Sequence, residues 1–291
     1  MKLETGRPDV DRRDLNTIHR GFFYLTRLDL YQEQKPYVVN FPVTDADFKR
    51  TNLSHKLHED IPLCDVRGHE DRFCLDTHGF QMLKHSSKMP NEDFENDAII
   101  RSTYYPEIET LIKNALGASK VFIFEHTPRL HVPYKQGCGC DRKRRPLISA
   151  HIDQTKEASI QRVQYHMGSE AEELLKNRFQ VVNVWRPLFG PLRDFPLTLG
   201  DARSFDLDRD GEATDLVFPH YVGESINLYH HPDHKWYYIS DQMRDEVWLF
   251  KNYDSKQGVA PAAPHCSFDL QEGKYIERPR ESIEIRALVF F

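Results

Sequence analysis

Short aromatic and β-branched segments, separated by turn residues, make up most of the second half of the sequence. Such segments favour strands because their side chains pack well on a pleated surface, while Gly, Pro, Asp and Asn favour the turns between them. Many short strands at turn-bounded intervals are typical of a β-sandwich or barrel. We therefore predict a mainly β fold with flanking helices. The predicted strands span residues 21–28, 35–43, 120–130, 180–188, 235–242, 246–253 and 282–291.

Two segments have the pattern of a helix. Residues 94–118 carry apolar side chains at helical spacing, with Pro106 suited to a first helical turn and Gly117 to the end. Residues 166–179 form the second candidate, with Ser169 as the expected N-cap. Both helices would pack beside the β core.

The composition argues against several classes of protein. The 291 residues contain 39 Lys and Arg against 45 Asp and Glu, and the net charge of −6 does not suit a nucleic-acid-binding protein. No apolar run approaches the roughly 18 residues that a membrane span needs. The N-terminus lacks the apolar region of a secretory signal and cysteines are sparse, so we expect a reducing, cytoplasmic location.

One spacing suggests a metal site. His151 and Asp153 lie two residues apart, and on a strand such residues point to the same side. An imidazole and a carboxylate suit Fe(II) in oxygenases, which usually take a second histidine as third ligand. His265, expected on a later strand, is the best candidate. The alternative is that His151 caps a turn and Asp153 is solvated, and the residues alone leave both interpretations open.

Two other groups of residues have metal-binding side chains. His230, His231 and His234 fall in a turn with Pro and Asp, and a turn this short rarely aims three imidazoles at one ion. Cys138 and Cys140 lack a second cysteine pair. We interpret both groups as ordinary loop residues.

The last predicted strand alternates with period two. Arg280, Ser282, Glu284 and Arg286 share one face, and apolar side chains share the other. A guanidinium and a hydroxyl on one face suit the binding of a dicarboxylate. The alternative is that Arg280 forms an ion pair with a neighbouring glutamate, Glu281 or Glu284.

Two arginines lie inside otherwise apolar predicted strands, where an unpaired charge is costly. Arg129 or Arg186 could bind a carboxylate of a substrate or co-substrate, or form an internal ion pair. Asn183, a further candidate for substrate binding, precedes Arg186 by three residues. The two side chains should therefore face opposite sides of the strand.

Several segments, spread over most of the chain, carry a resemblance to a known family. They are Asp65-Val-Arg67-Gly68, Tyr104-Tyr105-Pro106-Glu107, Phe124-Glu-His126-Thr127-Pro-Arg129, His151-Ile-Asp153-Gln154-Thr155, Asn183-Val-Trp185-Arg186-Pro187-Leu188, Lys235-Trp236-Tyr237-Tyr238, Pro264-His265-Cys-Ser-Phe268 and Arg280-Glu-Ser282-Ile-Glu284-Ile-Arg286. With these segments the chain resembles the fungal AsaB-like hydroxylase/desaturase family, which includes gibberellin desaturase-like proteins.

The resemblance implies a single domain over residues 1–291 with a double-stranded β-helix core, the jelly roll of cupin-like proteins. Residues 1–118 would form a mixed α/β support and residues 119–291 the jelly roll. It also implies non-haem Fe(II), with 2-oxoglutarate and O2 as co-substrates. His151, Asp153 and His265 match the positions of the iron ligands.

Arg280 and Ser282 look like the Arg-x-Ser pair that holds 2-oxoglutarate in related oxygenases. The interval between His265 and Arg280 is longer than is usual there, which keeps Arg286 as a second candidate for the anchor.

The function expected from the resemblance is oxidation of an unactivated C–H bond of a small molecule in secondary metabolism. Hydroxylation, desaturation and oxidative cyclisation stay open, and Arg129 and Arg186 motivate an amino acid as one substrate. One alternative is a catalytically silent jelly-roll accessory protein; another is a zinc hydrolase on the same ligands with Glu284 as its base. We expect a small-molecule partner, no nucleic acid and no membrane, and leave a homodimer open.

Overall fold

The structure is a computed structural model that describes residues 11–45, 47–130, 146–271, 274, 276 and 278–291. Cys138 and Cys140 lie outside these residues. The strands are β1 (Thr17–Leu25), β2 (Tyr37–Val39), β3 (His55–Asp65), β4 (Phe80–Lys84), β5 (Lys120–Leu130), β6 (His151–Ile152), β7 (Phe179–Pro187), β8 (Leu197–Gly200), β9 (Gly211–Val217), β10 (Val222–Leu228), β11 (Trp236–Tyr238), β12 (Glu246–Asp254), β13 (His265–Ser267) and β14 (Glu281–Phe290). The α-helices are α1 (Leu30–Glu33), α2 (Leu75–His78), α3 (Asp97–Ile99), α4 (Tyr105–Leu116), α5 (Lys156–Met167), α6 (Ala171–Leu174) and α7 (Leu207–Asp210).

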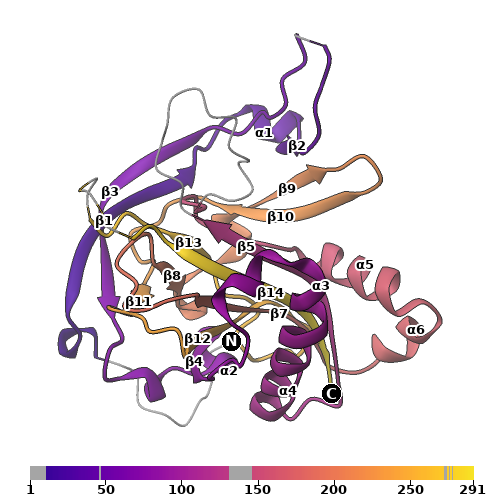
Figure 1. The fold of residues 1–291 in the computed structure, drawn as a ribbon. Coiled ribbons are helices and arrows are strands. Elements are labelled where there is room, and N and C mark those ends of the chain that lie inside the picture. The colour runs from indigo at the N-terminus through magenta and orange to yellow at the C-terminus, as the bar shows by residue number, and fades with distance from the viewer. Residues whose placement is uncertain (1–10, 46, 131–145, 272–273, 275, 277) are drawn as a thin grey trace.

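The strands form two sheets (Figure 1). One has the order β1-β3-β11-β8-β13-β6-β10-β9-β2, and the other has the order β4-β12-β7-β14-β5. From β5 to β8, and again from β11 to β14, successive strands alternate between the two sheets. This alternation is the winding of a double-stranded β-helix, and the β9–β10 hairpin is inserted between its two halves. The mainly β prediction is confirmed, while the division at residue 118 stays a prediction.

Helix α4 covers the outer face of the five-stranded sheet (Figure 1). Its Ile108 and Ile112 are fully buried, and they belong to one apolar cluster with Ile283 and Ile285 of β14. The helix has Pro106 in its first turn and ends at Gly117, whose φ of 68° is in the left-handed region that glycine tolerates. The helix predicted within residues 94–118 is therefore confirmed.

The helix predicted over residues 166–179 is only partly helical: it overlaps the last two residues of α5 and contains the four-residue α6. Helix α5 starts at Lys156 because the Thr155 hydroxyl accepts a hydrogen bond from the backbone N–H of Ala158, at 3.1 Å. It ends at Met167, and Gly168 follows with a φ of 56°. Ser169 lies in the 3₁₀ turn after the helix, so its assignment as N-cap was wrong. No helix in the described ranges is long and apolar enough to cross a bilayer.

A buried carboxylate links the start of β12 to the end of β4 and to the segment that follows β3. Glu246, at the start of β12, is 3% exposed and accepts hydrogen bonds from Arg67 at 2.5 and 2.9 Å and from Lys84 at 2.9 Å. Burial alone would raise the pKa of Glu246. Its bonds from Arg67, from the Met243 backbone N–H and from Lys84 instead lower that pKa to about 2.

We predict that Glu246→Gln lowers the free energy of unfolding by about 2 kcal/mol at neutral pH, because Arg67 loses a charged hydrogen-bond partner. A lowered carboxyl pKa stabilises the folded state above the group's usual pKa of 4.5, and the stabilisation disappears as the pH falls towards 2. Urea unfolding of both proteins across this range measures the effect. Glu109→Gln, which removes an exposed ion pair with Lys113, is the control and should change stability by less than about 0.5 kcal/mol. A constant difference between Glu246→Gln and wild type down to pH 2 would contradict the prediction.

Candidate metal centre and adjoining cavities

Strand pairing brings the two predicted histidine ligands together. His151 of β6 and His265 of β13 are direct partners in the antiparallel ladder, although 113 residues separate them in the chain. Their ring centroids lie 4.3 Å apart. Asp153 follows β6 immediately, and its carboxylate oxygens lie 3.4 Å from His151 Nε2 and 3.9 Å from His265 Nε2. One ligand atom from each of the three residues lies within 4.8 Å of the others.

The backbone fixes which nitrogen of each ring faces the centre. His151 Nδ1 lies 2.8 Å from the Ser149 carbonyl oxygen, and His265 Nδ1 lies 3.1 Å from the Ala263 carbonyl oxygen. A carbonyl oxygen only accepts, so each Nδ1 carries the proton and each Nε2 keeps its lone pair. Both rings are thereby oriented as metal ligands are in proteins.

An amide and a guanidinium hold the carboxylate of Asp153, and a second amide holds its backbone. Its Oδ2 accepts hydrogen bonds from Asn183 Nδ2 at 2.7 Å and from Arg286 Nε at 2.9 Å. The Asn252 side chain accepts from the Asp153 backbone N–H and donates to Asn183 Oδ1. Asn183 therefore bonds to two protein groups and supports the carboxylate, while its role in substrate binding stays a prediction.

The charges of the site leave its donor set ready for a cation. Burial favours the neutral form of Asp153, but nearby Arg286 and the two histidines together hold its pKa well below the usual value. Burial and neighbouring His151 lower the pKa of His265 to about 3. At neutral pH the site thus offers a carboxylate and a neutral His265, and two imidazoles with one carboxylate are the ligand set that non-haem Fe(II) takes.

Arg286 is committed to carboxylates. Besides Asp153, it contacts Glu125 at 3.4 Å and forms an ion pair with Glu284. These three acidic groups outweigh the effect of burial and raise the pKa of Arg286. Glu284 is the residue that a zinc hydrolase would use as its base. Its carboxylate forms an ion pair with the Arg286 guanidinium.

A narrow cavity adjoins the histidines on the side of β14. His151 and His265 line it together with Arg129, Ser267 and Arg280. Arg280 is 1% exposed and donates through Nη1 to Ser267 Oγ at 2.6 Å and to the Phe195 carbonyl at 2.8 Å. Burial and the like charge of Arg129 lower the pKa of Arg280 to about 9.

Two buried polar atoms near this cavity lack a hydrogen-bond partner among the described residues. They are Nε of Arg280 and Oγ of Ser282. Buried polar groups in proteins are nearly always paired, so unpaired ones of this kind mark a place for water or a ligand. Because Arg129 and Arg280 repel each other, an anion between them would be stabilised.

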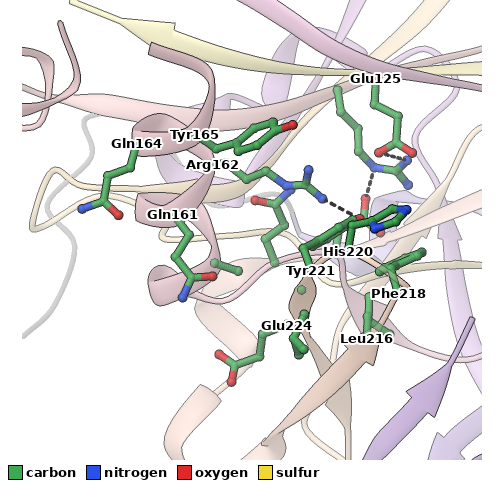
Figure 2. Close-up of a pocket in the computed structure, with 16 residues that line it drawn as sticks. Glu125, Gln161, Arg162, Gln164, Tyr165, Leu216, Phe218, His220, Tyr221 and Glu224 are labelled. Atoms are coloured by element: carbon green, nitrogen blue, oxygen red, sulfur yellow. Dashed lines mark hydrogen bonds and ion pairs between the residues drawn. The ribbon is translucent and has the colours of Figure 1, made fainter. Parts of the chain in front are cut away.

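A much larger cavity, of about 790 Å³, opens beside Asp153 and Arg286. Its walls are helix α5 and the β9–β10 hairpin (Figure 2). Arg162 of α5 extends across to the hairpin, where it donates to the Tyr221 hydroxyl at 3.3 Å, and its guanidinium lies 5.2 Å from the Tyr221 ring centroid. Phe218 and Tyr221 stack with their ring centroids 4.6 Å apart.

The two arginines chosen from the sequence fall in different places. Arg129 lines the narrow cavity. Arg186 lies on the opposite face of β7 from Asn183, as the alternation predicted, and is buried against His85 and the ring of Tyr104. Neither is among the described residues that line the 790 Å³ cavity.

The alternative histidine group does not form a site. His234 is buried and bonds through Nε2 to Asp210 at 3.0 Å, whereas His230 is exposed and stacks on His58. Within the described part of the chain, three metal-binding side chains come together at His151, Asp153 and His265.

Two residues of the large cavity, Arg162 and Tyr221, could not be predicted from the sequence. Neither belongs to a recognisable motif, because an arginine on a helix and a tyrosine in a turn are common on any surface. Thr155 could have indicated the start of helix α5, because a threonine is a favourable N-cap. Its hydroxyl accepts from the backbone N–H of Ala158, so the helix begins shortly after Asp153.

Comparisons with known proteins agree with this geometry. The family described as "Oxidoreductase/YMDC permease-like domain" matches residues 22–290. The hydroxylase/desaturase efuI of Hormonema carpetanum is 35% identical over 78% of this chain and 82% of its own. The Fe(II)/2-oxoglutarate-dependent dioxygenase nvfI of Aspergillus novofumigatus is 32% identical over 85% of this chain and 86% of its own.

A solved structure is also similar. The iron and alpha-ketoglutarate-dependent endoperoxidase NvfI aligns with a TM-score of 0.82 at 29% identity, covering 94% of this chain and 98% of that one. The similarity confirms the jelly-roll fold that the resemblance implied. The chain therefore belongs to this oxidoreductase family, which it shares with fungal hydroxylase/desaturases and Fe(II)/2-oxoglutarate-dependent dioxygenases.

Proposed function

We propose that the protein is an Fe(II)/2-oxoglutarate-dependent oxygenase that oxidises a small molecule of fungal secondary metabolism, with His151, Asp153 and His265 as the iron ligands. The observation that carries this proposal is the meeting of the three side chains, whose ligand atoms lie within 4.8 Å of one another. The relatives named as hydroxylase/desaturase and dioxygenase support the same chemistry.

The chain's own contribution is to place and hold the ligands. The backbone carbonyls at Ser149 and Ala263 orient the imidazoles, and Asn183 and Arg286 keep the Asp153 carboxylate ionised and in position. Bound Fe(II), with 2-oxoglutarate and O2, would supply the oxidising power for an unactivated C–H bond. Hydroxylation, desaturation and oxidative cyclisation all start from this arrangement.

We further propose Arg280 as the anchor of the distal 2-oxoglutarate carboxylate, with Ser282 beside it. Both arginines line the narrow cavity with the two histidines, and two features support Arg280 over Arg286: its unpaired Nε, and the repulsion from Arg129 that a dianion would relieve. Arg286 already contacts three carboxylates. The small-molecule substrate then occupies the large cavity beside Asp153.

A direct test is anaerobic reconstitution with Fe(II) followed by titration with 2-oxoglutarate. We expect one iron per chain and a visible charge-transfer band that saturates with 2-oxoglutarate. A protein that binds iron in stoichiometric amount but develops no band would contradict the assignment of the co-substrate, and a protein that binds no iron would contradict the whole proposal.

We predict that replacing His151, Asp153 or His265 by alanine abolishes stoichiometric iron binding, because two remaining ligands hold Fe(II) poorly. Iron content by atomic emission and succinate formation measure the loss, and far-UV circular dichroism checks the fold. His230→Ala is the matched control, since His230 is exposed and remote from the ligand set, and it should retain full iron. Retention of iron by the His265 variant would refute the ligand assignment.

We also predict opposite effects for two arginines on β14. Arg280→Lys should raise the KM for 2-oxoglutarate by tenfold or more and leave iron affinity unchanged, because lysine cannot form the bidentate contact. Arg286→Lys should instead weaken iron affinity by about 10- to 100-fold, since it loosens Asp153. Iron titrations and KM measurements on both variants separate the roles. The reverse pattern would make Arg286 the anchor.

A further inference from the structure

The residue after the Asp153 ligand has an unusual position. Gln154 is 5% exposed and lines the 790 Å³ cavity together with Asp153. Its buried Oε1 has no hydrogen-bond partner among the described residues. Gln154 also borders a second cavity, of about 440 Å³, which Asn252 lines as well. Gln154 thus lies beside the metal ligands at the inner end of the large cavity.

Neighbouring amides differ from Gln154 because they are paired. Asn183 and Asn252 bond to each other and to Asp153, and the Thr155 hydroxyl caps helix α5. Among the residues that line the large cavity, Gln154 is the one with a buried side-chain atom that lacks a partner in the described ranges. A buried acceptor without a donor is costly, and a ligand that supplies the donor removes that cost.

The rest of the lining indicates the size and polarity of the ligand. A cavity of about 790 Å³ is in the range that holds drug-sized molecules. The hairpin contributes Leu216, Phe218, Tyr221 and Val222, and the rings of Phe218 and Tyr221 stack on each other at this side of the cavity (Figure 2). Tyr221 and Val222 are 45% and 52% exposed, as expected of apolar residues that a ligand would cover.

The charged residues of the lining are engaged by the protein. Glu125 contacts Arg286, and Glu224 forms an ion pair with Lys35. Arg162 is held by the rings and hydroxyl of the hairpin side. A charged group at the metal end of a ligand would therefore meet Glu125 and Arg286, whose charges offset each other, and this disfavours its desolvation.

From these observations we propose that Gln154 is a specificity-determining residue, which accepts a hydrogen bond from a hydroxyl or N–H group on a bulky, largely apolar substrate that is uncharged at its reacting end. This inference rests on the proposed function, because it takes the large cavity as the substrate site. It also disfavours a free amino acid, since Arg129 and Arg186, the two arginines that motivated that idea, are not among the described residues lining the cavity.

The test uses matched tetracyclic probes that differ in one group: androstanol, androstanone and androstane. Binding to the full chain, loaded anaerobically with Fe(II) and 2-oxoglutarate, is measured by calorimetry. We expect the alcohol to bind wild-type protein about tenfold more tightly than the hydrocarbon, as one buried hydrogen bond allows. Gln154→Met should bind both probes equally. Gln164→Met, on the exposed outer part of the same cavity wall, should keep the preference.

Thermal unfolding without probes separates a recognition role from a structural one. Gln154→Met should be as stable as wild type or more stable, because it removes an unpaired buried oxygen; a loss of stability would indicate that the amide serves the fold and would overturn the proposal. Three binding results would also overturn the proposal: an alcohol that binds no better than the hydrocarbon, a ketone that binds better than the alcohol, or a preference for the alcohol that Gln154→Met leaves unchanged. The 2-oxoglutarate charge-transfer band reports on the metal site independently, so a failure of the proposed function is distinguishable from a failure at Gln154.

Discussion

The pairing of β6 with β13 is the contact on which the site depends. It sets His151 directly opposite His265, so the side chains of two residues far apart in the chain point to the same side of the sheet. β6 has two residues and β13 has three, and neither would be stable alone. Their neighbours β8 and β10 in the nine-stranded sheet hold them in register, which makes the ligand geometry a property of the whole sheet.

The Asp153 carboxylate shows how the second sheet takes part. Asp153 follows a strand of the nine-stranded sheet, while Asn183, Asn252 and Arg286 come from three adjacent strands of the five-stranded sheet. The carboxylate thus bridges the two layers of the sandwich. Replacing a group on either layer therefore affects the same carboxylate. A network of this kind is stable because each of its members is paired.

Sequence reasoning could predict the candidate ligand residues, which the structure brings together, and the outer architecture, because those depend on short-range patterns. The His-x-Asp spacing, the alternation along β14 and the helix that ends at Gly117 follow from local geometry. The hydrogen-bond partners of individual polar groups did not follow from the sequence. Asn183 and Arg286, candidates for substrate and co-substrate binding, both donate to Asp153, because the fold brings their separate strands together. Most of α5 lies outside the predicted helices, because the capping role of Thr155 has no strong signal in the sequence.

The β9–β10 hairpin is inserted in the middle of the double-stranded β-helix. Its base is tied to the ligand strand, since Asn227 pairs with His151, whereas its tip at Phe218 and Tyr221 faces the large cavity. Amino-acid changes at the tip can therefore accumulate during divergence without disturbing the proposed iron ligands at the base. Such a separation allows relatives to keep one oxidative centre while they accept different substrates. The tip is therefore a suitable segment to exchange between relatives when chimaeric proteins are made.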